Sequence, residues 1–483
     1  MNSFWEFVEG MGRAFLGFFD RAVSNINDAL YGYILIILLI VVGVYFTIRT
    51  RFVQFRLLGE QIKAVTEKPE SKKGVSSFQA LMVSTASRVG TGNIIGVSTA
   101  LCIGGFGSIF WMWLIAIIGG ASAFVESTLA QIYKKKNSNG FHGGPAYYIE
   151  AGLHSRGLAV LFSVFLILTY GFGFNMLAAY NLQSTFSFYE FYNPQISPWI
   201  IGVILTVIVA FCLLGGGKSI IKVTSLLVPV MGVVYVLTAL AIILINITAL
   251  PGIFSRIFSE AFDVKAIFGG FSGSCVMYGI KRGLFSNEAG VGSAPNASAS
   301  AEVNHPVKQG LVQVLSVFLD TLLVCSATAF MCMCSGIEPT EELSGAPYVQ
   351  QALSQTLGSF GPVFITVAMI LFAFTTLLGN IYYVDQGMYY ILKKVPGKAF
   401  HTILHIFLAL IILLGSVLSA NLLWNIADVL MGAMTIINIP AIFILGKYAV
   451  RALRDYEKQR KNGEMPTFHV KDIELPHKVD YWS

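Results

Sequence analysis

Residues 87–96 read Ser87-Arg88-Val89-Gly90-Thr91-Gly92-Asn93-Ile94-Ile95-Gly96, a polar and glycine-rich stretch within an otherwise apolar segment. Glycine weakens an α-helix, because each one costs about 1 kcal/mol relative to alanine and frees backbone groups. Within lipid, such groups must be satisfied by protein, water or a ligand. A packing seam of small residues between helices needs neither the charge of Arg88 nor the amide of Asn93. The stretch therefore predicts an interrupted membrane helix.

The chain on both sides of this stretch has the composition of a membrane protein. Of 483 residues, 55% are hydrophobic and 12% are charged, whereas soluble domains carry about 25% charged residues. Apolar runs long enough to cross about 30 Å of hydrocarbon recur along the chain. We predict an all-α integral membrane protein with eleven transmembrane helices, near residues 31–48, 78–100, 106–133, 158–186, 198–215, 220–248, 266–285, 309–335, 361–392, 401–420 and 422–446.

The basic residues predict the orientation of these spans. If the loop after the first span is cytoplasmic, the cytoplasmic segments hold 27 of the 32 Lys and Arg residues, as the positive-inside rule requires. The N-terminal segment (1–30) is then extracytoplasmic, and the tail (447–483) is cytoplasmic and solvated. This distribution favours a multi-pass protein of a prokaryotic plasma membrane over a nucleic-acid-binding protein.

A second glycine-rich stretch, Gly269-Gly270-Phe271-Ser272-Gly273-Ser274, falls in the predicted seventh span. The two interrupted spans open two sets of five, 78–248 and 266–446, which begin on opposite sides of the membrane. This pattern predicts a leucine-transporter-type 5+5 inverted repeat with one extra N-terminal helix. A broken helix offers N–H groups to a carboxylate and carbonyl oxygens to Na⁺. We therefore expect a carrier that couples a cation to an amino acid, which supplies the carboxylate.

Several long motifs then give a family resemblance. Residues 88–96 (RVGTGNIIG) resemble the first broken helix of the alanine or glycine:cation symporter family. The segments 281–295 (KRGLFSNEAGVGSAP), 110–113 (FWMW), 143–149 (GGPAYYI) and 305–310 (HPVKQG) also resemble the family. The likeness covers nearly the whole chain from about Tyr31. It implies eleven spans, coupling to Na⁺ or H⁺, and small neutral amino acids as substrates.

The resemblance also implies a substrate site at the first broken helix. The N–H groups around Thr91 and Gly92 would hold the substrate carboxylate, and the break in the seventh span would face it. The implied substrate-binding residues are Arg88, Gly90, Thr91, Gly92, Asn93, Phe174, Asn175, Gly269, Gly270, Gly273 and Asn380.

The likeness to the leucine-transporter-type sodium site implies an ion site nearby. The carbonyls of Ala86 and Val89 would pair with oxygens of the ninth span, namely the carbonyl of Phe372 and the hydroxyls of Thr375 and Thr376. Threonines in membrane helices also commonly hydrogen-bond their own backbone, and this alternative stays open.

The buried charge of Arg88 has two interpretations. Such a charge costs roughly 3 kcal/mol on insertion scales, so it needs a partner or a wet cavity. Either it contacts the substrate, or it pairs with an intramembrane acid, for which the candidates are Glu126, Asp320, Asp385 and Asp428. A second charged group, Lys281, Arg282 and Glu288, is predicted at the cytoplasmic end of the seventh span, either as an inner-gate latch or in a solvated loop.

Asn380 bears on substrate size. It lies about one helical turn beyond Thr375 and Thr376 and is expected to face the same cavity. In alanine carriers of the family this position is commonly Trp, and an amide leaves more room. The pattern resembles that of the glutamine-transporting members, so we expect glutamine as well as alanine and glycine. In the alternative, Asn380 caps a neighbouring backbone group.

Two other classes of function are disfavoured. The seven histidines lie in loops, in the tail or at span ends, and no HExxH motif or nucleophile elbow occurs, which argues against an enzyme. No filter segment is repeated, as a channel would require. We expect no cofactor beyond Na⁺ as the coupling ion, with a proton-coupled carrier as the alternative.

Overall fold

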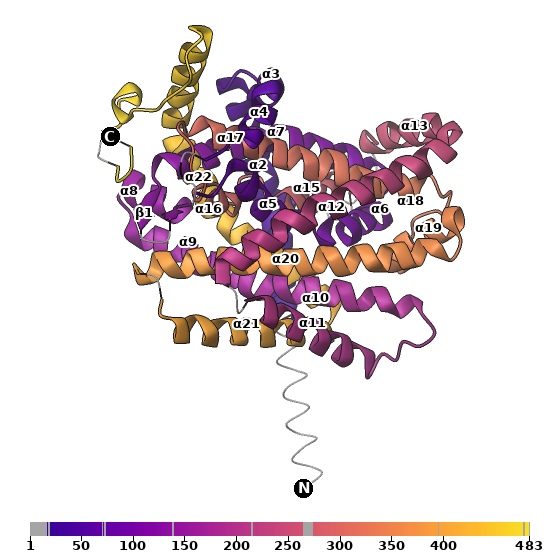
Figure 1. The fold of residues 1–483 in the computed structure, drawn as a ribbon. Coiled ribbons are helices and arrows are strands. Elements are labelled where there is room, and N and C mark those ends of the chain that lie inside the picture. The colour runs from indigo at the N-terminus through magenta and orange to yellow at the C-terminus, as the bar shows by residue number, and fades with distance from the viewer. Residues whose placement is uncertain are drawn as a thin grey trace.

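A computed structural model describes residues 17, 20–69, 71, 74–137, 140–213, 216–263, 274–394, 396–476 and 479–482 (Figure 1). The predicted break at Gly269, Gly270 and Gly273 lies outside these residues. The regular secondary structure of the described chain is helical, apart from a two-stranded antiparallel hairpin and an isolated bridge between Val75 and Ala301.

Eight helical segments of the described residues are long and apolar enough to cross a membrane. They are Asp20–Arg49, Gly107–Ile132, Arg156–Phe188, Ser219–Ile245, Val307–Met333, Phe360–Leu392, Lys398–Val417 and Ala420–Lys461. These segments coincide with eight of the predicted spans. The predicted spans at 78–100, 198–215 and 266–285 correspond to shorter or interrupted helices, so the total of eleven and the inverted repeat stay predictions.

The elements follow in chain order. The first half contains η1 (Leu30–Ile34), α2 (Leu35–Arg49), α3 (Val53–Arg56), α4 (Leu58–Thr66), α5 (Ser77–Arg88), η2 (Gly92–Gly96), α6 (Val97–Gly104), α7 (Gly107–Ile132), β1 (Lys135–Asn137), β2 (Gly140–His142), α8 (Pro145–Leu153), α9 (Arg156–Leu168), η3 (Thr169–Gly173), α10 (Phe174–Thr185), η4 (Phe186–Phe188), α11 (Ser197–Leu213), α12 (Gly216–Ile245), η5 (Ile247–Ala249) and α13 (Leu250–Ala261). The second half contains α15 (Cys275–Asn287), α16 (Ala294–Ser298), α17 (Val307–Val317), η7 (Phe318–Cys325), α18 (Ser326–Met333), η8 (Glu341–Leu343), α19 (Ala346–Leu357), α20 (Phe360–Leu392), α21 (Lys398–Val417), α22 (Ala420–Lys461) and η9 (Val470–Ile473).

The connecting segments gather at two opposite ends of the bundle (Figure 1). In the figure, α10, α20 and α21 run side by side, with α8, β1 and the C-terminal residues at one end and α13 and α19 at the other. The sequence places the same segments on the same two sides of the membrane. The grouping of the segments therefore agrees with the predicted alternation.

The helices differ in whether they pack within the bundle or face outward. Helix α7 is the central element and packs against α2, α13, α15, α17 and α22. Helices α11 and α12 instead present apolar side chains outward, among them Val207, Phe211 and Val230. Such a broad apolar surface suits contact with lipid.

The tail differs from its prediction. Helix α22 continues to Lys461 instead of ending near 446, and the residues after it fold back on the bundle. The indole of Trp482 donates a 2.7 Å hydrogen bond to the carbonyl of Gln131. Phe468 and Trp482 are both buried, so these parts of the predicted tail pack against other residues instead of being solvated.

Candidate functional site

At the first helix break, a side chain accepts a backbone hydrogen bond that a continuous helix would form internally. Helix α5 starts with a capping box, in which Ser76 and Gln79 satisfy each other's backbone N–H groups. At its other end, the N–H of Gly90 would reach the carbonyl of Ala86 in a continuous helix. It donates to Asn93 Oδ1 at 2.8 Å instead. The helix therefore ends at Arg88, and the Ala86 carbonyl loses its helical donor.

A second break follows α15. Glu288, Gly290 and Gly292 have φ angles of 51°, 84° and 93°, a left-handed conformation that a helix cannot continue through. Two distant side chains hold the turn. The N–H of Gly290 donates to Glu126 Oε1 at 3.3 Å, and Asn438 Nδ2 donates to the carbonyl of Gly290 at 2.9 Å and to Glu126 Oε2 at 2.8 Å.

This second break was not predicted from the sequence, and the predicted break of the seventh span stays a prediction. The predicted span ended at 285, and the predicted interruption lay upstream of α15, outside the described residues. In the described chain the interruption is at Glu288–Ser293, in a stretch predicted as a loop. Glu288 is fully buried there and accepts a 2.5 Å hydrogen bond from Ser293.

The two breaks lie against each other. The hydroxyl of Ser87, one residue before the end of α5, is 3.4 Å from Glu288 Oε1. A Cβ atom on Gly92 would stand 2.8 Å from the ring of Phe285, so only glycine fits beneath that ring. Phe285 in turn packs on Phe174 of α10, with ring centroids 4.7 Å apart. Phe174 therefore lies beside the first break.

Buried amides surround the same break. Asn380 accepts from Ser87 Oγ at 2.7 Å and donates to Asn175 Oδ1 at 3.0 Å. Asn181 donates to the hydroxyl of Thr91 at 3.1 Å. Asn175 Nδ2 has no hydrogen-bond partner among the described residues. The structure thus brings Asn175 and Asn380 together beside Ser87 and places Asn181 against Thr91. It leaves the amide donor of Asn175 for a further group.

The two threonines of α20 point in different directions. The hydroxyl of Thr375 donates to its own helix, at the carbonyls of Leu371 (3.0 Å) and Phe372 (3.2 Å). The hydroxyl of Thr376 is buried without a partner in the described part of the chain. It lies 2.0 Å from the Cβ position that Gly90 leaves open. Of the two hydroxyls, that of Thr376 faces the first break at Gly90.

Arg88 points toward α17. Its Nη1 donates to Gln313 Oε1 at 2.9 Å, and its Nε and Nη2 have no partner in the described ranges. Within those ranges it forms no ion pair, although its charge acts on the carboxyls of Glu126, Glu288 and Asp320.

Asp428, a predicted candidate partner of Arg88, is paired elsewhere. Its Oδ2 lies 2.6 Å from Arg282 and 3.1 Å from Lys281. Both basic residues are buried, and the Arg282 guanidinium lies over the ring of Trp424. The solvated-loop interpretation of this charged group is therefore wrong.

A buried polar network ties the first break to two further elements. Asn93 Nδ2 donates to Asp320 Oδ1 at 2.7 Å and to Ser286 Oγ at 3.0 Å. The other oxygen of Asp320 accepts from Ser286 at 2.7 Å and from Thr321 at 2.9 Å. Asp320 belongs to η7, a π-helical segment like η2 and η3. Such segments are frequent at functional sites.

Comparison with known proteins identifies the protein family. The sequence profile of the sodium:alanine symporter family matches residues 17–470. The chain belongs to this family.

Named relatives of the symporter family are similar over nearly their whole length. The chain is 41% identical over 466 residues to the amino-acid carrier protein AlsT of Bacillus subtilis, covering 96% of this chain and 98% of the relative. It is 42% identical over 465 residues to the probable sodium/glutamine symporter GlnT of the same organism, covering 96% of each chain. It is 37% identical over 456 residues to the sodium/alanine symporter AgcS of Methanococcus maripaludis, covering 92% of this chain and 98% of the relative. The chain is therefore an amino-acid symporter and not an enzyme.

A solved structure shows the same fold. The crystal structure of MhsT in complex with L-phenylalanine superposes with a TM-score of 0.56 at 15% identity, covering 80% of this chain and 96% of that one. This likeness places the symporter in the leucine-transporter-type fold.

Sequence reasoning missed several residues of the two breaks. Ser87, Phe285 and Ser286 were inside quoted motifs without a role, and Asn181 and Asn438 were not considered. Ser87 and Ser286 directly adjoin the interrupted segments, which was a usable signal. Asn438 had none, because its contacts with Gly290 and Glu126 join residues 148 and 312 positions away.

Proposed function

We propose that this protein is a secondary active symporter that imports small neutral amino acids together with Na⁺ by alternating access. The proposed substrates are alanine, glycine and glutamine, in line with the names of AlsT, GlnT and AgcS. The observation that carries the proposal is the unpartnered hydroxyl of Thr376, which faces Gly90 at the first break, where the carbonyl of Ala86 has lost its helical donor. A buried hydroxyl without a partner is costly, and a bound cation would remove that cost.

In this proposal the substrate lies at the first break. Its carboxylate accepts from the N–H groups around Thr91 and Gly92, at the positive end of the helix that begins there. Phe174 packs beside the apolar part of the substrate. The free donor of Asn175, oriented by Asn380, meets a carbonyl on a longer side chain such as that of glutamine.

The coupling ion lies on the other side of the break. Its proposed ligands are the carbonyls of Ala86, Val89 and Phe372 and the hydroxyl of Thr376, with the hydroxyl of Thr375 as a much weaker ligand. Of these hydroxyls, that of Thr376 is the one oriented toward the break, and Thr375 would have to exchange its bonds with its own helix for the ion.

The orientation in the plasma membrane follows from the basic residues. We place the end of the bundle that carries α8, β1 and the C-terminal residues in the cytoplasm, since most Lys and Arg residues occupy the segments of that side. The N-terminus then lies outside.

Uptake into proteoliposomes tests the proposal. An inward Na⁺ gradient should drive saturable, stereospecific accumulation of labelled alanine, and the recovered label should be unchanged alanine. If one Na⁺ accompanies each zwitterion, an inside-negative potential of 100 mV contributes about 2.3 kcal/mol, or roughly 50-fold accumulation. Uptake that depends neither on the Na⁺ gradient nor on the membrane potential would contradict Na⁺ symport.

Proton coupling is the second candidate, and one observation favours it. Glu126, Glu288 and Asp320 are all fully buried, and buried acidic groups serve as proton relays in transporters. A pH gradient without Na⁺ should then drive alanine uptake, whereas the proposed Na⁺ symporter shows none under these conditions.

A further inference from the structure

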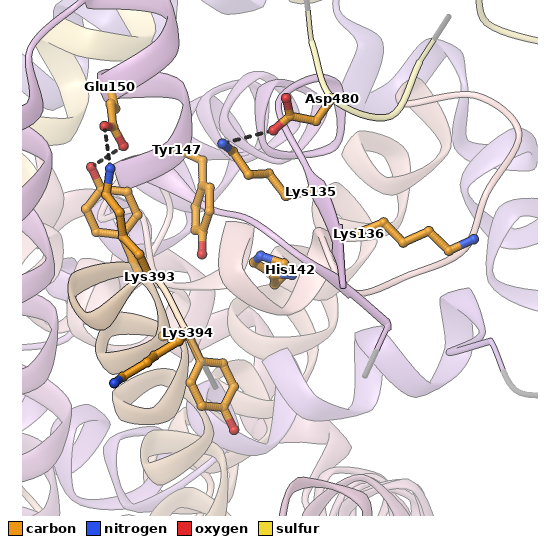
Figure 2. A pocket seen from close by; sticks show the side chains of 10 residues that line it. Lys135, Lys136, His142, Tyr147, Glu150, Lys393, Lys394 and Asp480 are labelled. Carbon is orange, nitrogen blue, oxygen red and sulfur yellow. Dashed lines mark hydrogen bonds and ion pairs between the residues drawn. The ribbon is translucent and has the colours of Figure 1, made fainter. Parts of the chain in front are cut away.

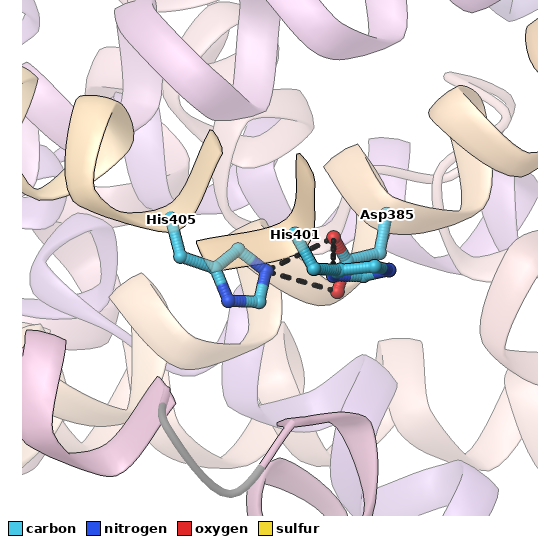
Figure 3. Close-up of side chains that lie close together, drawn as sticks. All are labelled: Asp385, His401 and His405. Carbon is cyan, nitrogen blue, oxygen red and sulfur yellow. Dashed lines mark hydrogen bonds and ion pairs between the residues drawn. The ribbon is translucent and has the colours of Figure 1, made fainter. Parts of the chain in front are cut away.

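A cluster of metal-ligating side chains lies away from the proposed transport site. Asp385 of α20 faces His401 and His405 of α21 (Figure 3). One ligand atom from each residue lies within 4.8 Å of the other two. Asp385 is nine residues beyond Thr376 on the same helix, roughly 13 Å along its axis. The cluster is therefore separate from the proposed sodium ligands.

The spacing of the ligand atoms fits a small divalent ion. Two ligands of tetrahedral zinc, each about 2.0–2.1 Å from the metal, stand about 3.3 Å apart. His405 Nε2 is 3.1 Å from Asp385 Oδ1, and His401 Nδ1 is 3.7 Å from the same oxygen. The two histidines are four residues apart on one helix, which places both rings on the same face. Two imidazoles and a carboxylate are a donor set that zinc and its neighbours in the first transition row bind.

A further residue supports this function of His401. The hydroxyl of Tyr389 lies 3.0 Å from His401 Nε2. Metal-binding histidines commonly donate their other ring N–H to an outer partner, which fixes the tautomer. If Tyr389 accepts from Nε2, the lone pair of Nδ1 faces the Asp385 carboxylate, and a cation between them removes the repulsion.

The cluster also has a route to solvent. His401 is 21% exposed at its side chain. Tyr389 also lines a cavity of about 690 Å³ together with His142, Tyr147, Lys393 and Lys394 (Figure 2). Tyr389 therefore links this cavity to His401, which its hydroxyl contacts.

We propose that Asp385, His401 and His405 form a binding site for a divalent transition-metal ion of the zinc class, with Tyr389 as a positioning residue. A metal there joins α20 to α21 next to their connecting loop.

Cobalt provides a direct probe, because tetrahedral Co²⁺ absorbs visible light strongly and octahedral Co²⁺ absorbs weakly. Purified full-length protein, first stripped with a chelator, should bind one Co²⁺ per chain with a tetrahedral spectrum that Zn²⁺ abolishes. His405→Gln and Asp385→Asn should lose the spectrum. Tyr389→Phe should bind about ten- to a hundredfold more weakly. His142→Gln, which changes a histidine in the adjoining cavity, should bind normally.

The wild-type titration decides the matter even if a variant fails to fold. A wild-type protein without stoichiometric tetrahedral Co²⁺ shows that the three residues form only a histidine–aspartate contact. A spectrum that survives His405→Gln and Asp385→Asn also overturns the assignment.

Discussion

The two helix breaks of this symporter differ in how their polar groups are satisfied. At the second break, Glu126 and Asn438 bond both backbone groups of Gly290, and Ser293 satisfies Glu288. At the first break, Asn93 satisfies Gly90, yet the hydroxyl of Thr376 remains without a protein partner in the described chain.

This difference separates two uses of the same local structure. A break whose backbone groups are bonded within the protein serves as a structural turn, because a ligand there would have to displace internal hydrogen bonds. The backbone groups of Gly290 are bonded in this way, although the nearby Asn287 Nδ2 is buried without a partner among the described residues. A break with unpartnered groups is stabilised when a ligand binds, because the ligand supplies the missing partners. The account therefore assigns substrate and ion binding to the first break and structural support to the second. Substitutions at the first break should impair binding, and those at the second should impair stability.

The largest expected effect is on binding at the first break. Gly92→Leu places side-chain atoms where even a Cβ stands 2.8 Å from the Phe285 ring, so alanine binding should weaken at least about a hundredfold, or about 2.7 kcal/mol. Calorimetry on protein in nanodiscs measures this. Gly157→Leu is the control, since a Cβ there meets no heavy atom within 4 Å. Wild-type affinity in Gly92→Leu would show that the substrate does not approach this backbone.

The next effect is on stability at the second break. Asn438→Leu keeps the branched shape of the side chain, with methyl groups larger than the amide atoms, and leaves Glu126 Oε2 and the carbonyl of Gly290 each without a donor. This should cost roughly 3 kcal/mol. Thermal unfolding in detergent should show a clear fall in Tm. Thr435→Val is the matched control, because that hydroxyl bonds only its own helix at Met431. If Asn438→Leu is as stable as the control and loses alanine binding, the second break is also a ligand site.

A smaller effect is expected on substrate choice. Asn380→Trp should reduce the ability of glutamine to compete with labelled alanine about five- to tenfold, which corresponds to about 1 kcal/mol. The affinity for alanine should change little, because its shorter side chain does not need the space that the indole fills. Asn380→Ala, which removes the amide without filling space, separates the loss of hydrogen bonds from the loss of room. If excess glutamine leaves alanine uptake by the wild-type protein unchanged, the enlarged-pocket argument is wrong.

The sequence predicted what local composition determines. Glycines and a polar side chain within a few residues were enough to find the interruption at Gly90–Gly92. Helical spacing was enough to orient Asn380 toward it. Residues whose role depends on distant partners were not predictable in this way. Glu288 and Arg282 looked like charges at a membrane edge, because Ser87 and Asp428, which lie beside them in the fold, are 201 and 146 positions away.

The matched pair Thr375 and Thr376 tests the central claim most directly. The measurement is the Na⁺ concentration at which the thermal stabilisation of the protein by saturating alanine reaches half its maximum. It is made on the wild-type protein, Thr376→Val and Thr375→Val. Because only the Thr376 hydroxyl faces the first break without a partner, Thr376→Val should raise that concentration about tenfold, or about 1.4 kcal/mol. Thr375→Val should change it less than about twofold, since its hydroxyl already bonds the backbone. A Na⁺ requirement that is unchanged in Thr376→Val, or that rises more in Thr375→Val, would contradict the account.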